Sequence, residues 1–293
     1  MPSLRDIRTR ITSVNNTGKI TRAMQMISAT KLRKAQNAML AARPYSNKLF
    51  EMLSYLSSAV DRESYPLLNL RERKAVELIV LTSDKGLCGA FNTNVLKETA
   101  RLIQELKADG IQLSIVAIGK KARDYFHRFG VPVRKTYIDF YKNIKYEDVQ
   151  GIAQEIIDSY TNGTIDELII IYNEFKSVMV QTPKRARLLP VEPQSAAGAG
   201  NVGDGVLDKF LFEPSEAEIL NTLLPKYVEN QIYRAILESR VSEEAARMIA
   251  MENANNNTKE LLSKLTLQYN KARQATITTE LMDIVGGAEA LSQ

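Results

Sequence analysis

The stretch Lys226–Val285, KYVENQIYRAILESRVSEEAARMIAMENANNNTKELLSKLTLQYNKARQATITTELMDIV, decides the fold, because these 60 consecutive residues include neither proline nor glycine. Pro225 precedes the stretch and Gly286-Gly287 follow it. Since both residue types interrupt helices, the stretch predicts one helix about 90 Å long. Such a helix exceeds the diameter of a domain of this size, so it must project or pair with another long element.

Apolar residues recur in this region at steps of three and four, as expected for a helix with one buried face. They form three groups with this spacing: first Leu224, Val228, Ile232 and Ile236, then Ala245 and Ile249, then Leu262, Leu265, Tyr269 and Ala272. The stripe weakens at 253–257, where four of five residues are asparagine. Asparagine is a poor helix former, so we predict that this is the least stable part of the helix.

The beginning of the chain predicts a partner for this helix. A similar apolar stripe begins with Leu4, Ile7, Ile11 and Val14. After Thr17-Gly18 it resumes one residue out of phase with Ile20, Met24 and Ile27, and helix-compatible sequence continues towards Ser58. Two long amphipathic helices at opposite ends of a chain can bury their stripes against each other. We therefore predict an antiparallel coiled coil in which the C-terminal helix extends beyond the shorter N-terminal one.

Between residues 75 and 190, short apolar runs alternate with helical segments, which is typical of a layered α/β unit. Right-handed crossovers between such strands predict a parallel, Rossmann-like sheet. A further strand at 177–189 contains Pro183 and is expected at a sheet edge. The other strands are expected at 76–81, 113–118, 136–140 and 168–172, and the helices at 93–108, 120–129 and 146–160.

The fold class is therefore α/β, with a long antiparallel coiled coil of the terminal helices around a central Rossmann-like domain. Residues 193–206 are rich in glycine and read as a flexible connection. We divide the chain into an N-terminal coiled-coil helix (1–60), a central α/β domain (75–190), a flexible connection (191–214) and a C-terminal coiled-coil helix (215–293).

Charge is distributed unevenly along the chain. The net charge is +5, but residues 1–43 hold nine basic residues against one acidic residue, Asp6, a formal charge of +8. Such a segment favours an acidic partner, although a solvated helix face is the simpler alternative. No aromatic residue is interleaved with these cations, which disfavours single-stranded nucleic acid as the partner.

Composition excludes several other classes. One cysteine, Cys88, and one histidine, His127, leave no intramolecular disulfide and no cysteine-rich or histidine-rich metal site. No apolar run is long enough to span a bilayer, and residues 1–6 lack the apolar core of a secretory signal. Any membrane association is therefore expected to be peripheral.

The segment Ser83–Asn92, SDKGLCGAFN, follows the first expected strand and opens a helix, where many α/β folds bind phosphate. Its glycines fit neither nucleotide-binding fingerprint, so a tight turn is favoured over a phosphate cradle. An activated Cys88 thiol is disfavoured because no histidine base is expected nearby. The acidic pairs Glu243-Glu244 and Asp166-Glu167 are expected to be solvated. We predict no catalytic, cofactor-binding or metal-binding residue.

Four segments together resemble the gamma subunits of rotary ATP synthases. They are Ile7–Met26 (IRTRITSVNNTGKITRAMQM), Thr82–Asn92 (TSDKGLCGAFN), Glu244–Met251 (EAARMIAM), and Tyr269–Ala290 with YNKARQA, Ile277–Glu280, Asp283, Gly287 and Ala288. These segments occur in the family's order and span nearly the whole chain, which makes the resemblance more specific than any one glycine-rich loop. Asn255-Asn256-Asn257-Thr258 departs from the usual family sequence, and a single cysteine excludes the paired-cysteine switch of chloroplast members.

The resemblance implies a non-catalytic rotor shaft without a cofactor. The shaft would turn inside a ring of three alpha and three beta subunits, driven by the membrane ring of c subunits as protons cross, while ATP forms in the other subunits. The α/β domain would bind the small epsilon subunit. Family contacts with the alpha/beta ring match Met24, Arg273, Gln274, Thr278, Glu280 and Asp283, and lower-stalk contacts match Phe210, Phe212 and Glu213.

The resemblance also implies a peripheral membrane protein on the cytoplasmic face of the bacterial plasma membrane, with no nucleic acid partner and no direct lipid insertion. Two other hypotheses remain. The chain could be a non-rotary coiled-coil scaffold that tethers a complex to anionic membranes. It could also be a small-molecule enzyme that uses the Asp84–Asn92 turn as a phosphate cradle.

Overall fold

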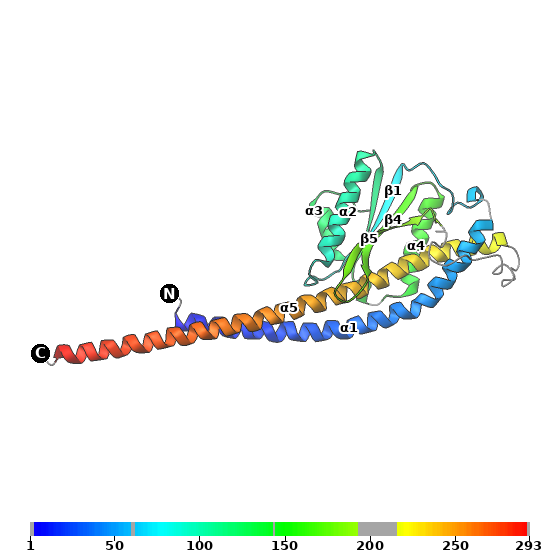
Figure 1. Cartoon of the computed structure of the whole chain (residues 1–293). Coiled ribbons are helices and arrows are strands. Elements are labelled where there is room, and N and C mark those ends of the chain that lie inside the picture. Colours follow the sequence, from blue (N-terminus) through cyan, green and yellow to red (C-terminus); the bar gives the residue numbers. More distant parts are fainter. Residues whose placement is uncertain (1–2, 60–61, 143, 193–215, 292–293) are drawn as a thin grey trace. The chain divides into compact units, whose positions relative to one another are not determined.

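The computed structural model describes residues 3–59, 62–142, 144–192 and 216–291 (Figure 1). The chain divides into two compact units, each described by itself below. Unit 1 comprises Met1–Ala29 and Arg247–Gln293, and unit 2 comprises Thr30–Ala246. The two predicted terminal helices are confirmed as α1 (Leu4–Ala59) and α5 (Glu216–Leu291), and each contributes to both units.

Both long helices continue through a proline, Pro44 in α1 and Pro225 in α5. The sequence had indicated that the C-terminal helix starts after Pro225, but Pro225 lies inside this helix. Proline removes one hydrogen bond from a helix interior. The neighbouring Leu224 and Val228 are almost fully buried in the core of unit 2, and this burial outweighs the missing bond.

In unit 1, α1 and α5 run antiparallel and side by side (Figure 1). The buried or half-buried residues of α1 follow steps of four and three, a seven-residue repeat that is characteristic of left-handed coiled coils. Those in the repeat are Leu4, Ile7, Ile11, Val14, Gly18, Thr21, Gln25 and Ser28, and Met24 and Ala29 are half-buried beside it. On α5, Met251, Thr258 and Leu265 are buried at intervals of seven. The predicted pairing of the terminal helices is confirmed.

The predicted continuation of the α1 stripe through Ile20 and Ile27 is wrong. These side chains are 60% and 54% exposed, whereas Thr21 and Ser28 are buried. Small residues let two helices approach closely, and the Thr21 hydroxyl is satisfied because it donates to the carbonyl of Gly18 at 3.1 Å. We call the paired α1 and α5 of unit 1 the rod. Close packing in this part of the rod therefore favours small side chains over large apolar ones.

Unit 2 contains a five-stranded sheet in the order β3-β2-β1-β4-β5. Its first four strands pair in parallel, as predicted, and β5 pairs antiparallel to β4 at the edge, where Pro183 is tolerated. The expected strand at 136–140 is shorter, because Asp139 adopts φ 60° and a 3-10 helix, η2 (Phe140–Lys142), follows. The strands are β1 (Ala75–Leu81), β2 (Gln112–Ile118), β3 (Lys135–Tyr137), β4 (Glu167–Phe175) and β5 (Gln181–Leu189).

Helices cover both faces of this sheet, and the alternation of side chains along β1 shows how. Val76, Leu78 and Val80 pack with α2 (Phe91–Ala108) and α3 (Lys120–Arg128). Ile79 and Leu81 face the opposite core, which α4 (Tyr146–Thr161) shares with the unit 2 parts of α1 and α5. The unit 2 part of α5 is thus seated on the sheet, with Leu224, Val228, Ile232 and Ile236 in this core.

Candidate functional site

The C-terminal part of α5 is not covered by any of the residues of unit 1 that the structure describes. From Arg273 to Val285, a segment we call the α5 tip, every side chain is exposed. Five of these are large apolar residues, exposed from 48% at Ile277 to 67% at Ile284: Ile277, Leu281, Met282, Ile284 and Val285. A concentration of exposed apolar side chains marks a binding surface. The α5 tip is therefore the candidate site for a partner protein.

The position of the tip follows from the pairing of the two helices. Gly18 of α1 faces Thr258 of α5. In an antiparallel pair, the first residue of α1, Leu4, then lies level with about Ala272, where the burial of α5 ends. The predicted extension of the C-terminal helix beyond the N-terminal one is therefore present in unit 1.

The predicted contact residues of α5 all lie on the exposed tip. At about 100° per residue, Gln274 and Thr278 share the apolar side of the helix, while Arg273 and Glu280 lie together at its border. Asp283 lies on the opposite side. These residues surround the helix instead of sharing one face, which suits a partner that encloses the tip.

Met24, the predicted contact on α1, is half-buried and lies elsewhere. The Gly18–Thr258 contact places it about 30 Å along the rod from Arg273. A single small contact patch could not include both positions. The nine basic residues of α1 up to Arg43 are all exposed and would be available to an acidic surface.

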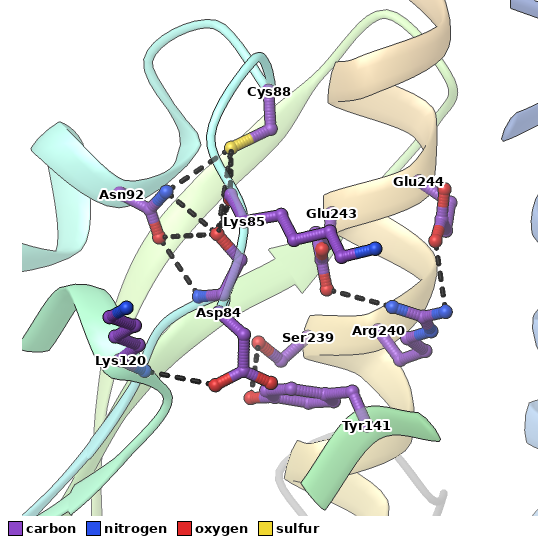
Figure 2. A network of polar contacts seen from close by, with 11 residues as sticks. Asp84, Lys85, Cys88, Asn92, Lys120, Tyr141, Ser239, Arg240, Glu243 and Glu244 are labelled. Carbon is purple, nitrogen blue, oxygen red and sulfur yellow. Dashed lines mark hydrogen bonds and ion pairs between the residues drawn. The ribbon is translucent and has the colours of Figure 1, made fainter. Parts of the chain in front are cut away.

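The Ser83–Asn92 turn uses its own polar groups for internal hydrogen bonds (Figure 2). The Asn92 amide nitrogen donates to Ser83 Oγ at 2.8 Å and to Cys88 Sγ at 3.2 Å, and Asn92 Oδ1 accepts from the Ser83 amide at 2.9 Å. Asp84 Oδ1 accepts from the amide of Lys120 at 3.0 Å and so caps α3. These contacts support the tight-turn interpretation, because the donors a phosphate would need from Ser83 and Asn92 are already used.

The expectation that Glu243 and Glu244 are solvated is wrong, since they are 4% and 1% exposed on α5. The Arg240 guanidinium lies 3.0 Å from Glu243 Oε2 and 2.9 Å from Glu244 Oε1 (Figure 2). Buried carboxylates persist where a guanidinium bonds them in this way. The flanking Val241 and Ala245, both fully buried, were the sequence signal that this part of α5 faces the core.

The expectation that the second acidic pair, Asp166 and Glu167, is solvated is also wrong. Glu167 on β4 is 7% exposed and lies 3.4 Å from Arg73 Nη1. Asp166 Oδ2 accepts hydrogen bonds from the backbone amides of Lys74 and Ala75, at 3.0 and 2.9 Å. Both carboxylates hold the beginning of the sheet together.

The carboxyl edge between β1 and β4 is the place where doubly wound folds bind ligands, because the strand order reverses there. In this chain α5 is hydrogen-bonded to β4 at that edge. Ser242 of α5 donates to the backbone carbonyl of Asn173 on β4 at 3.0 Å, and the Asn173 amide donates to the carbonyl of Phe91 at 3.0 Å. The sheet is thus a seat for a helix.

The remaining predictions concern the lower-stalk contacts, membrane-spanning segments and metal sites. Phe210, Phe212 and Glu213, and residues 193–214 of the predicted connection 191–214, lie outside the described residues. Within the described ranges, no helix combines the length and the hydropathy needed to cross a bilayer. The same ranges contain no group of three or more histidine, cysteine or acidic residues arranged to hold a metal ion.

Residues 3–291 match the family model described as ATP synthase. The ATP synthase gamma chain of Pelotomaculum thermopropionicum is 45% identical over 291 residues, covering 99% of this chain and 100% of the relative. The gamma chain of Geotalea daltonii is 46% identical over 291 residues, covering 99% of each. These similarities extend over both units.

Solved structures share the fold. A chain of the Tetrahymena thermophila mitochondrial ATP synthase central stalk/c-ring structure aligns with a TM-score of 0.59 and 25% identity, over 80% of this chain and 99% of that one. A chain of the Euglena gracilis mitochondrial ATP synthase rotor aligns with a TM-score of 0.61 and 20% identity, over 94% and 98%.

Proposed function

This chain belongs to the family of ATP synthase gamma chains, the non-catalytic central-stalk rotor subunits, and we propose that its α5 tip is the part that turns against the alpha and beta subunits. Met24, Arg273, Gln274, Thr278, Glu280 and Asp283 are the proposed contacts with that ring. Rotation of the shaft would place the three catalytic sites in different states in turn, and ATP would form at those sites.

The observation that carries this proposal is the exposure of every side chain on the α5 tip, where five large apolar residues share one side of the helix and the proposed contact residues lie around it. An isolated helix of this kind is marginally stable in water and gains from a partner that surrounds it. A ring of subunits encloses a helix from all sides, whereas a single flat partner would cover only one side.

The basic residues of α1 would add electrostatic attraction to acidic segments of the ring. The nine cations up to Arg43 are exposed, and exposed ion pairs contribute only about 0 to 1 kcal/mol each. Steric contact between the rotor and its ring is therefore expected to carry most of the torque. A variant with a neutralised α1 that assembled but did not rotate would contradict this expectation.

The c-ring and the epsilon subunit are the other proposed partners. The Tetrahymena thermophila structure contains a central stalk with its c-ring, and we extend that assembly to this chain. Phe210, Phe212 and Glu213 are the proposed lower-stalk contacts, and the division into segments 1–60, 75–190, 191–214 and 215–293 is retained as part of the proposal. The chain would then be a peripheral protein on the cytoplasmic face of the bacterial plasma membrane.

Affinity purification of the tagged chain from its own cells tests the proposal. Membranes would be extracted with mild detergent, and the co-purifying proteins identified while ATP hydrolysis is measured. Alpha, beta, epsilon and c subunits together with hydrolytic activity are expected. Recovery of the chain alone, with binding of the purified chain to anionic liposomes, would instead support a membrane-tethering scaffold.

A further inference from the structure

Within unit 2, α5 is joined to the α/β domain by side-chain hydrogen bonds as well as by apolar contacts. Tyr146, the first residue of α4, donates its hydroxyl to Glu229 Oε2 at 3.0 Å. Ser242 donates to the backbone carbonyl of Asn173 on β4 at 3.0 Å. The residue that pairs with Asn173 on β5 is Pro183, which has no N–H to offer.

A third bond lies between these two along the helix. Tyr141 of η2 donates to Ser239 Oγ at 3.4 Å, the longest of the three distances (Figure 2). Both groups are buried. The helix is therefore bonded to three separate elements of the domain, α4, η2 and β4.

The three bonded positions of α5 are spread around the helix and along it. At the rise and turn of an α-helix, Glu229 and Ser242 lie about 20 Å apart along the axis and about 140° apart around it. Ser239 lies between them in angle. The apolar residues Ile232 and Ile236, which are fully buried, lie within the same sector. The hydrogen bonds thus stand on both sides of the apolar contact.

This arrangement opposes rotation of α5 about its own axis in either direction. Apolar contact is not directional, so a helix held by it alone can turn slightly at little cost. A side-chain group about 5 Å from the helix axis moves by roughly 3 Å when the helix turns by about 30°. Such a movement breaks a hydrogen bond, because it carries the donor and the acceptor well beyond hydrogen-bonding distance.

We infer that Tyr146, Tyr141 and the Asn173 carbonyl are tethers that fix α5 rotationally against the α/β domain, so that torque passes between them without slip. This inference rests on the proposed rotor function. Tyr146, Tyr141, Glu229, Ser239 and Ser242 are positioning residues, since they act on the helix and touch no reacting group.

The chemistry of the tyrosines suits a permanent tether. Burial, reinforced by the hydrogen bond to Glu229, raises the pKa of Tyr146 well above its usual range. Burial likewise raises the pKa of Tyr141. Both hydroxyls therefore remain protonated donors at physiological pH. The Tyr146 ring also packs edge-on against Tyr233 of α5 with centroids 5.4 Å apart, which fixes its direction.

The test compares, in the assembled complex, a tether variant that removes three hydroxyl groups with a control variant that removes two. The tether variant is Tyr141→Phe, Tyr146→Phe and Ser242→Ala. The control variant is Tyr160→Phe and Ser159→Ala, whose hydroxyls donate within the domain to Asn69 O at 3.0 Å and Glu155 O at 2.9 Å. Both variants lose buried or half-buried hydroxyl groups, but only the first loses bonds to α5. Co-purification of the ring subunits with each variant is checked first.

Two readouts follow in membrane vesicles that contain the assembled enzyme. ATP hydrolysis and ATP-driven proton pumping are measured together, and hydrogen exchange is measured at the amides of residues 229–242. The tether variant is expected to pump fewer protons per ATP hydrolysed than the control. Its exchange is expected to be faster by about fivefold for each hydroxyl removed, as a typical hydrogen bond implies. Glu229→Gln, which keeps an acceptor, should retain the pumping ratio.

The outcomes separate this inference from the function on which it rests. Failure of the unmodified chain to assemble with ring subunits would remove the proposed function. An unmodified chain that assembles, together with a tether variant whose pumping ratio and exchange equal those of the control, would overturn the tether inference alone. The single variants Tyr146→Phe and Ser242→Ala provide the same comparison where the combined variant does not assemble.

Discussion

Gly18 of α1 packs against Thr258 of α5 so closely that a Cβ atom added to Gly18 would lie 3.0 Å from Thr258 Cγ2. Thr258 is buried, and its hydroxyl donates to the carbonyl of Ala254 at 2.7 Å. A side chain at Gly18 therefore has no room unless Thr258 moves. The contact fixes which residues of the two helices stand opposite each other in unit 1.

Enlarging Gly18 is expected to destabilise the rod. Gly18→Leu should lower the free energy of unfolding by about 1 to 3 kcal/mol through overpacking against Thr258. Thr258→Ala should restore part of this loss in the double variant, because it removes the opposing methyl group. Gly151→Leu on α4, where nothing lies within 4 Å of an added Cβ, is the matched control. Thermal unfolding followed by circular dichroism is measured for the unmodified chain and the three variants. An equal loss of stability from Gly18→Leu and Gly151→Leu would contradict the packing role.

The asparagine-rich part of α5 is expected to open more readily than its neighbours. Asn256 and Asn257 are exposed and gain nothing from packing within unit 1. Replacing each by alanine should stabilise the helix by roughly 0.5 kcal/mol and slow hydrogen exchange of residues 253–258. Asn270→Ala, also at an exposed position of α5, should leave exchange at 253–258 unchanged. Slower exchange at 253–258 than in the flanking residues of α5 that pair with α1, before any substitution, would show that the prediction is wrong.

Truncating the apolar residues of the α5 tip should separate folding from function. Leu281→Ala with Ile284→Ala is expected to change the free energy of unfolding of the isolated chain by no more than about 0.5 kcal/mol, because both side chains are exposed. In the complex, the same variant should weaken ATP synthesis. Met179→Ala in the β4–β5 turn, at 74% exposure, is the control for loss of an exposed apolar side chain. Unchanged synthesis in the tip variant would argue against contact between these residues and the ring.

The stability of unit 2 should depend on pH through Glu155 of α4. The hydrogen bond from Lys135 is the main cause that holds the pKa of Glu155 below its ordinary value of 4.5. Because the pKa is depressed in the folded state, the pair stabilises the fold above pH 4.5 and loses this contribution as the pH falls through the folded value. Glu155 is one-third exposed, so the contribution should be below about 1 kcal/mol.

Glu155→Gln tests this dependence by thermal unfolding at neutral pH and at about pH 3, near the lower end of carboxylate titration. The variant should be less stable than the unmodified chain at neutral pH, and the difference should shrink in acid. A difference that stayed constant between the two pH values would mean that the carboxylate charge is not responsible.

The elements of the fold could be predicted where one strong pattern determined them. The long helices followed from the rarity of proline and glycine together with a regular apolar stripe, and the parallel strands followed from short apolar runs. The pattern failed at Ile20 and Ile27, because the close approach at Gly18 replaces large apolar residues by small ones. Spacing of apolar residues alone contains no information about how near two helices come.

The candidate site could be predicted from the sequence only in part. The positions of the α5 tip came from a family resemblance, and the structure adds that these side chains are exposed and distributed around one helix. The buried charges Glu229, Glu243 and Glu244 were missed, since a carboxylate is normally solvated and its partners come from distant elements or from Arg240. Such contacts depend on tertiary packing, which local sequence does not specify.

Observation of single complexes tests the rotor function most directly. The head would be immobilised through its beta subunits, and a probe attached to a cysteine introduced at Met179, which is exposed, while the native Cys88 is buried and protected. On addition of ATP, we expect the probe to turn in one direction with three stops per turn, one for each catalytic site. ATP hydrolysis that continues while the probe stays fixed relative to the head would contradict the function proposed for this chain.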